Sequence, residues 1–300
     1  MLSISTAWSH KDHADGRQIL AQIKETGIPV IELGYRLTHI QLEQIISLLN
    51  EFKLQVSSLH NFVPLPNDFP SLRHPSNYYR LSALDEDERR RAVVWTKNTI
   101  DVAVRVKAKV VVVHAGMIEL PKELPERLIH LYKTGKAPTQ EFQAVRMELI
   151  TARQKARGPF IESVVKSFQE IMPYAQGKNI LIGLETRYYP VEIPNCDEIG
   201  EFLSQFHKQG MYYWHDVGHA EVNGRLGIAA PTKYLDQYRD QLIGFHLHGV
   251  QGLRDHLAPF TGDFDLTKVF PYIKDHHIKV IESSSSATLD QIRSAVKLLP

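Results

Sequence analysis

The chain has 300 residues, of which 43% are hydrophobic and 23% charged, so it can bury a large core and is neither disordered nor fibrous. Its 35 basic and 34 acidic residues nearly cancel, which leaves no overall charge to attract nucleic acid or an anionic membrane. The single cysteine, Cys196, excludes an internal disulfide and is typical of a reducing compartment.

The first eight residues have the pattern of a strand and lack the charged start and long apolar core of a signal peptide. No apolar run in the sequence is long enough to span a bilayer. We therefore expect a cytoplasmic protein with no membrane partner.

Eight apolar runs of strand length alternate with longer amphipathic segments, which is typical of parallel strands joined by crossover helices. The predicted strands are Leu2–Trp8, Val30–Tyr35, Gln55–Asn61, Lys109–Ala115, Ile180–Arg187, Met211–Asp216, Ile243–His248 and Ile278–Ser283. The predicted helices are Ala14–Thr26, Ile40–Phe52, Glu86–Val106, Cys196–His207, Lys233–Gln241, Leu266–His276 and Ala287–Leu299. This order predicts an α/β fold, a (β/α)8 TIM barrel that forms one domain over residues 1–300. A doubly wound sheet is the alternative that periodicity leaves open.

Two segments depart from the simple strand–helix alternation. Residues 62–80 form a long loop rich in proline, at Pro64, Pro66, Pro70 and Pro75, and such loops often cover a site. An insertion at about 117–157 follows the fourth strand and contains a charged helical stretch, Thr139–Arg157. We expect that helix to break at Gly158-Pro159 before a second apolar stripe begins.

Side chains that bind metals stand at the ends of six consecutive predicted strands. In chain order they are His60, His114, Glu185, Asp216 with His219 beyond it, His246 and Glu282. The C-terminal ends of barrel strands meet on one face, so these side chains should converge. Gly218 is expected to allow a sharp turn that returns His219 to Asp216. Mixed carboxylates and imidazoles suit a divalent cation, Mn²⁺, Mg²⁺ or Zn²⁺, with one or more per chain.

Several neighbours are candidates for contact with a substrate. Arg187 and His248 follow Glu185 and His246 by two residues and so share their strand faces. Arg187 is either a substrate clamp or part of a salt bridge, and His248 either lines the site or supports it. Trp8, together with Phe62, either forms an apolar wall against a sugar ring or is ordinary core. His215 is predicted to face outward, between strand and helix.

These residues resemble those of the xylose-isomerase-like superfamily, a barrel shared by sugar isomerases, ketose 3-epimerases, inosose dehydratases and endonuclease IV. The resemblance covers nearly the whole chain. It is carried by Leu184-Glu185-Thr186-Arg187, His215-Asp216-Val217-Gly218-His219, Phe245-His246-Leu247-His248 and Val280-Ile281-Glu282, with a looser His256, Pro259, Gly262 and Asp265.

The resemblance implies two different ligand sets. The positions that hold one metal in the epimerase branch match Glu185, Asp216, His246 and Glu282. The positions that complete a three-metal cluster in the nuclease branch match His60, His114, His219 and His256. The chain departs from the nuclease pattern at Arg254, where the third metal needs an aspartate, and Asp255 is displaced by one position. Since a guanidinium cannot ligate a cation, Arg254 is expected to bind a substrate hydroxyl or phosphate.

The first functional hypothesis is a metal-dependent isomerase or epimerase of a sugar, sugar phosphate or polyol that acts through an enediolate. Glu185 and Glu282 would be its base and acid. The expected substrate contacts are Arg187, His219, Arg254, His248 and Trp8. The second is a phosphodiester hydrolase of the endonuclease IV type, although the charge balance and the lack of a basic, aromatic stripe argue against nucleic acid. The third is a barrel that binds a metabolite or metal without turnover.

Overall fold

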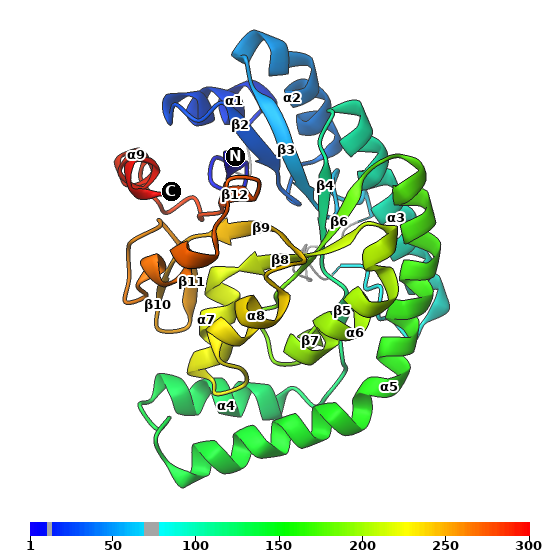
Figure 1. Ribbon diagram of the computed structural model, residues 1–300, viewed down its shortest axis with the longest axis vertical. Helices are drawn as coiled ribbons and strands as arrows, with labels where there is room; N and C mark the ends of the chain where they lie inside the picture. The colour runs from blue at the N-terminus through cyan, green and yellow to red at the C-terminus, as the bar shows by residue number, and fades with distance from the viewer. Residues whose placement is uncertain (11–13, 69–77) are drawn as a thin grey trace.

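The computed structural model describes residues 1–10, 14–68 and 78–300, and its centre is a closed barrel of eight parallel strands (Figure 1). Around the ring the strands follow the order β1-β12-β9-β8-β6-β4-β3-β2. Their bounds are β1 Leu2–Ser5, β2 Val30–Leu33, β3 Gln55–His60, β4 Val110–Val113, β6 Leu181–Glu185, β8 Met211–Asp216, β9 Leu242–Leu247 and β12 Ile278–Ile281. β1 pairs with both β12 and β2, which closes the sheet, confirms the predicted TIM barrel and excludes a doubly wound sheet.

Helices surround the barrel as the periodicity predicts. Their bounds are α1 Gly16–Glu25, α2 His39–Phe52, α3 Glu86–Arg105, α4 Glu123–Lys133, α5 Gln140–Gly177, α6 Cys196–Phe206, α7 Val217–Arg225, α8 Pro231–Tyr238 and α9 Leu289–Leu298. Four of them begin with a capping box, in which side chain and backbone satisfy each other's free groups. These caps are Asp15, Thr38, Asn195 and Thr288. In the described ranges, no helix has the length and apolar character needed to cross a membrane.

The barrel interior is filled by a small apolar cluster below the strand ends. Val110, Val112, Trp214 and Val280 are fully buried there. Trp214 needs the space that Gly244 leaves, because a Cβ at that position would lie 2.3 Å from the indole ring. This packed layer supports the polar residues at the strand ends.

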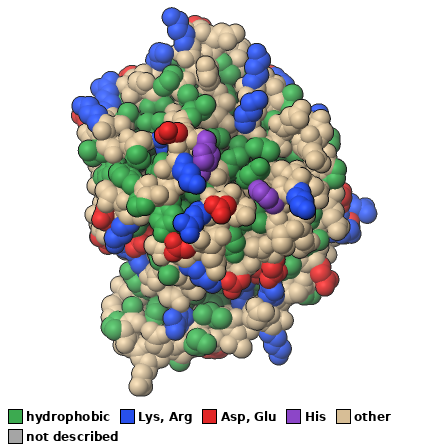
Figure 2. Space-filling view, viewed as in Figure 1, with side chains coloured by type: hydrophobic (Ala, Val, Ile, Leu, Met, Phe, Trp, Pro, Cys, Tyr) green, Lys and Arg blue, Asp and Glu red, His purple; other side chains and the backbone are tan. Residues whose placement is uncertain are grey.

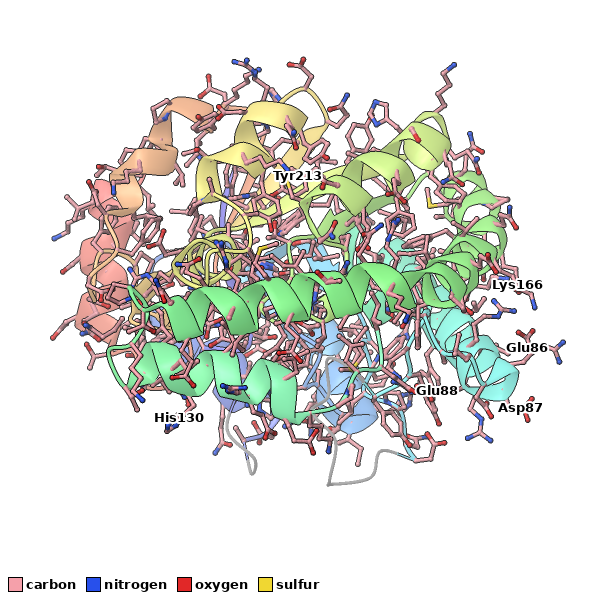
Figure 3. The ribbon with its side chains drawn as sticks, turned by 90° about the horizontal axis from the view of Figure 1, so that it is seen from below. Glu86, Asp87, Glu88, His130, Lys166 and Tyr213 are labelled. Atoms are coloured by element: carbon pink, nitrogen blue, oxygen red, sulfur yellow. The ribbon has the colours of Figure 1, made fainter. Side chains whose placement is uncertain are left out.

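The insertion after β4 forms a short hairpin and two long helices. β5, Gly116–Met117, pairs with β7, Glu192–Ile193, and α4 packs against the first half of α5. Figure 3 shows these two helices lying side by side. They share a second hydrophobic core with α7 and the loop after β10 (Gly249–Gln251). Its buried residues are Leu128, Leu131, Phe142, Val145, Leu149, Val191, Val222, Leu226 and Leu253.

The predicted break at Gly158-Pro159 is wrong, because α5 continues through both residues. A proline inside a helix removes one backbone hydrogen bond, but tertiary packing supplies most helix stability in a protein. Phe160 and Val164, just beyond the proline, are buried in the main core. Farther along, Lys166 pairs with Glu86 of α3 at 2.9 Å, at the right-hand edge of Figure 3. Contacts with the barrel and α3 therefore keep the helix continuous.

Two other local predictions are also wrong. Residues 266–276 were expected to form an α-helix, but only a 3-10 helix, Leu266–Tyr272, forms there, and it contains Pro271. Gly218 makes no sharp turn and lies in the first turn of α7. A Cβ on Gly218 would lie 2.1 Å from the ring of His248, so close packing explains the glycine. The expectation that loop 62–80 covers a site falls partly on residues 69–77, which lie outside the described residues.

A buried ion pair joins α5 to the segment that follows β6. Arg153 donates to both carboxylate oxygens of Glu198, at 2.7 and 2.8 Å, and to the backbone carbonyls of Pro190 and Glu192. Both side chains are almost fully buried. This guanidinium therefore fixes the path of residues 190–192 beside the strand ends.

We expect Arg153→Ala to lower the free energy of unfolding by about 3 kcal/mol, because the carbonyls of Pro190 and Glu192 lose their donor and the buried Glu198 keeps only Arg157 and a backbone N–H. Denaturation in guanidinium chloride measures the change. The control is Arg127→Ala, which breaks an exposed pair with Glu141 and should cost less than about 1 kcal/mol. Equal effects of the two substitutions would contradict the role of the buried pair.

Candidate metal centre

A cavity of about 570 Å³ opens where the predicted metal-binding residues end their strands. Histidine, acidic and basic side chains are grouped near the middle of the face shown in Figure 2. The predicted site residues that line the cavity are His60, His114, Glu185, Arg187, His219, Arg254, His256 and Glu282. Asp216, His246 and His248 are fully buried beside them. The structure thus brings together every predicted ligand position.

One group of candidate ligands consists of His60, Glu185, His246 and Glu282, whose donor atoms lie within 4.8 Å of one another. Nδ1 of His246 lies 2.6 Å from Oε1 of Glu185 and 3.0 Å from Oε2 of Glu282. Nε2 of His60 lies 3.7 Å from Oε2 of Glu185, and His114 approaches the same oxygen at 2.5 Å. Two carboxylates and two imidazoles facing one point fit a divalent cation.

A second group consists of Asp216, His219 and His256, again with donor atoms within 4.8 Å. Asp216 lies between the two groups, because its Oδ2 is 3.7 Å from Nδ1 of His246 and its Oδ1 is 3.6 Å from Nδ1 of His219. Asp255 lies on the outer side, 3.4 Å from Nε2 of His219 and 3.1 Å from Nδ1 of His256. The resemblance implied that Asp216 joins the first set; geometrically it can serve either.

Asp216 also begins α7. As the N-cap residue, it accepts a hydrogen bond of 2.7 Å from the backbone N–H of His219. This cap, rather than a glycine turn, returns His219 to the strand end. The Nδ1 of His219 is 2.8 Å from the carbonyl of Thr186, which orients the ring.

His248 supports Asp216 from behind. Its Nδ1 accepts a hydrogen bond from the backbone N–H of His256 at 3.0 Å, so Nε2 carries the proton. That proton points at both oxygens of Asp216, each 3.1 Å from Nε2. His248 does not line the cavity, so its contacts are those of a supporting residue.

Arg187 is held between two carboxylates. It donates to Oε2 of Glu185 at 2.7 Å and to Oε1 of Glu192 at 2.8 Å. Its Nε has no hydrogen-bond partner among the described residues. Arg187 therefore forms the salt bridge that was one of its two alternatives, and it also lines the cavity, so its role as a substrate clamp stays a prediction.

The pKa values show a site that concentrates opposite charges. Burial opposes ionisation of Glu185, Asp216 and Glu282, but nearby histidines outweigh it and hold the pKa of each carboxyl well below its usual range. Burial also lowers the pKa of His246, yet Glu282 and neighbouring carboxylates raise it well above the ordinary value. His114 differs, because burial and the charge of Arg187 lower its pKa to about 3.

Sequence reasoning missed two acidic residues of the site, Glu32 and Glu192, and noted Asp255 only as displaced by one position from an expected ligand. Glu32 is the third of the four residues of β2, is fully buried, and lies 3.2 Å from Nε2 of His246. An acid in an otherwise apolar strand, Val30-Ile31-Glu32-Leu33, was the available signal. Glu192 and Asp255 follow from contacts between distant loops, for which the sequence gives no spacing rule.

The aromatic residues proposed as a sugar-facing wall lie in the core. Trp8 is 1% exposed, and its indole N–H donates to the carbonyl of Ala287 at 2.8 Å. Phe62 is buried against Tyr79. Neither lines the cavity. The side chain of His215 is on the outer face of β8, as expected. It bonds to the hydroxyl of Tyr213 and packs against Tyr234 of α8.

The sequence pattern of the xylose isomerase-like TIM barrel family matches residues 20–299. The chain belongs to this family. No protein among those with curated descriptions matches it.

Solved structures similar to the chain have the same barrel. A D-tagatose 3-epimerase-like protein has a TM-score of 0.68 and 15% identity, and the match covers 99% of this chain and 95% of that chain. The D-psicose 3-epimerase of Clostridium cellulolyticum H10 has a TM-score of 0.67 and 12% identity, with 99% and 97% covered. The 3-keto-D-glucoside 4-epimerase of E. coli has a TM-score of 0.65 and 12% identity, with the same coverage. At this identity the likeness establishes the fold alone.

Asp216 allows metal binding to be separated from helix capping. Asn caps a helix about as well as Asp, so Asp216→Asn should keep α7 capped in the metal-free protein, with a loss of stability limited to the charge interactions with the nearby histidines, yet lose tight metal binding. In the wild type, metal at about 100-fold its Kd should add about 2.7 kcal/mol of stability. Thermal unfolding with and without Mn²⁺ measures both quantities. Full metal stabilisation of Asp216→Asn would remove this residue from the ligand set.

Proposed function

We propose that the protein is a metal-dependent isomerase or epimerase of a sugar, sugar phosphate or sugar-derived polyol. The observation that carries this proposal is the convergence of Glu185 and Glu282 on the same nitrogen of His246, from strands three places apart in the ring. A divalent cation bound there would polarise a substrate carbonyl and favour loss of a proton from the adjacent carbon as an enediolate forms.

The two glutamates are not equivalent in their surroundings. Both oxygens of Glu185 are held by strong donors, Oε1 by His246 and Oε2 by His114 and Arg187. Glu282 is held through Oε2 alone, and its Oε1 has no hydrogen bond from the described residues. Glu282 therefore has a free oxygen with which to take a proton from carbon. Glu185 would return a proton to the other face of the same carbon after receiving one from the histidine that bonds to it, and would end the step as the anion.

The outer part of the cavity suits a polar substrate. Arg36 and Arg254 line it, and neither forms a salt bridge with a described carboxylate. Arg254 reaches the hydroxyl of Ser286 at 3.4 Å. Guanidinium groups without a carboxylate partner are suited to bind hydroxyl or phosphate oxygens of a substrate. Arg187 and His219 would contact the substrate deeper in the cavity.

The similar solved structures support this substrate class, since their names describe a D-psicose 3-epimerase, a 3-keto-D-glucoside 4-epimerase and a D-tagatose 3-epimerase-like protein. Both named epimerisations invert a carbon centre next to a carbonyl group, which is the chemistry that two carboxylates on opposite sides of a substrate can perform.

With a ketose or aldose substrate in deuterated water, the enzyme should incorporate solvent deuterium at the reacting carbon. Glu282→Gln should reduce that exchange by at least about 1,000-fold, since it removes the proton acceptor, and Glu185→Gln should also reduce it strongly. Proton NMR of the recovered sugar measures the exchange.

The control for these variants is Glu201→Gln, which changes an exposed glutamate of α6 and should leave exchange intact. Turnover without deuterium in the product would indicate a hydride shift between carbons. Exchange that survives in both site variants would remove these glutamates from proton transfer.

A second candidate function is hydrolysis of a phosphodiester, which the second ligand group, Asp216, His219 and His256, favours. Two cations on either side of Asp216 would be placed to stabilise the attacking and leaving oxygens. Arg254 takes no part in that group, and the net charge of +1 does not favour DNA.

Metal analysis of the purified protein distinguishes the two candidates. One equivalent per chain is expected for the isomerase, and two or three would favour the hydrolase. We also expect no nicking of a duplex that contains an abasic site. Efficient nicking that Glu185→Ala abolishes would reverse the order of the two functions.

A further inference from the structure

The two ring nitrogens of His246 lie in different surroundings. Nδ1 faces Glu185, Glu282 and, at 3.7 Å, Asp216. Nε2 faces the opposite way, toward the two oxygens of Glu32 at 3.2 and 3.3 Å. A neutral imidazole offers one nitrogen as donor and the other as acceptor, so the partner of Nε2 decides what Nδ1 can do.

Among the described residues, His246 is the only ionisable partner of Glu32. Its side chain is fully buried, Ser58 donates a hydrogen bond to its Oε2 at 2.8 Å, and no described lysine or arginine pairs with it. It belongs to neither group of candidate ligands. Burying a carboxylate without a cationic partner is costly, so the charge of Glu32 needs a hydrogen-bond donor that offsets its desolvation.

We propose that Glu32 is a positioning residue that accepts the Nε2 proton of His246 and thereby presents the lone pair of Nδ1 to the metal. This inference rests on the proposed metal-dependent function. A carboxylate behind a ligating imidazole fixes its tautomer and ring orientation and makes the ligating nitrogen more basic.

The other histidine of the first ligand group has a weaker support. Nδ1 of His60 lies 3.3 Å from the carbonyl of Asn61, a neutral backbone group. Of the two histidines in that group, His246 therefore receives the stronger electronic support, and it is also the residue on which Glu185 and Glu282 converge.

The experiment measures the metal affinity of Glu32 variants by competition with a chelator. Glu32→Gln keeps an acceptor but loses the charge, and should weaken binding about 10-fold. Glu32→Ala loses both and should weaken binding about 100-fold. In zinc-loaded protein with ¹⁵N-labelled histidine, NMR should show Nδ1 of His246 bound to metal and Nε2 protonated.

Ser57→Ala is the matched control, because Ser57 is buried and bonds to the carbonyl of Ile31 and to the hydroxyls of Ser3 and Ser58, but to neither Glu32 nor His246. It should lower the stability of the metal-free protein without changing metal affinity. An equal loss of affinity in Ser57→Ala would reduce Glu32 to an ordinary packing residue and overturn the inference.

Two other results would also overturn it: wild-type affinity in both Glu32 variants, or zinc on Nε2 of His246. A wild-type protein that binds no divalent cation would overturn the proposed function as well. Because affinity is measured without substrate, a metal-binding protein that turns over no sugar removes only the proposed function.

Discussion

The structure depends on holding several carboxylates around one imidazole in the interior of the barrel. Glu185, Glu282, Asp216 and Glu32 come from four strands, and all have an oxygen within 3.7 Å of a ring nitrogen of His246. Like charges this close repel one another, and burial adds a desolvation cost. Hydrogen bonds from histidines and a guanidinium offset part of that cost, and a divalent cation would offset much more.

Closure of the barrel makes this arrangement possible. An open sheet with β1 and β2 at its two edges would leave β2 and β9 five places apart, whereas closure of the ring brings them within three places and lets Glu32 reach His246. The packed layer around Trp214 prevents the strand ends from collapsing inward. The candidate ligands come from several strands. The cost of charge repulsion and desolvation at the site is thus offset by the stability of the whole fold.

The barrel and the site residues at the strand ends could be predicted from the sequence, because both follow from short-range rules. Strand spacing placed Glu185 and Arg187 on one face, and the equivalence of strand ends gathered the ligands. The missed features arise between segments distant in the sequence. The partner of Glu32 is 214 residues away, and Asp255 meets His219 only because a hairpin folds over α7. The continuity of α5 through Pro159 likewise depends on packing that local propensity does not contain.

The second hydrophobic core links the insertion to the mouth of the barrel. It joins α4 and α5 to Val222 of α7, the helix that Asp216 caps, and to Leu253, which precedes Arg254. The insertion after β4 therefore packs against, and supports, the segments that follow β8 and β9. Relatives that exchange this insertion for one of another length would reshape the outer wall of the cavity while leaving the candidate metal ligands at the strand ends untouched, which would let the fold vary what the cavity binds without rebuilding those strand ends.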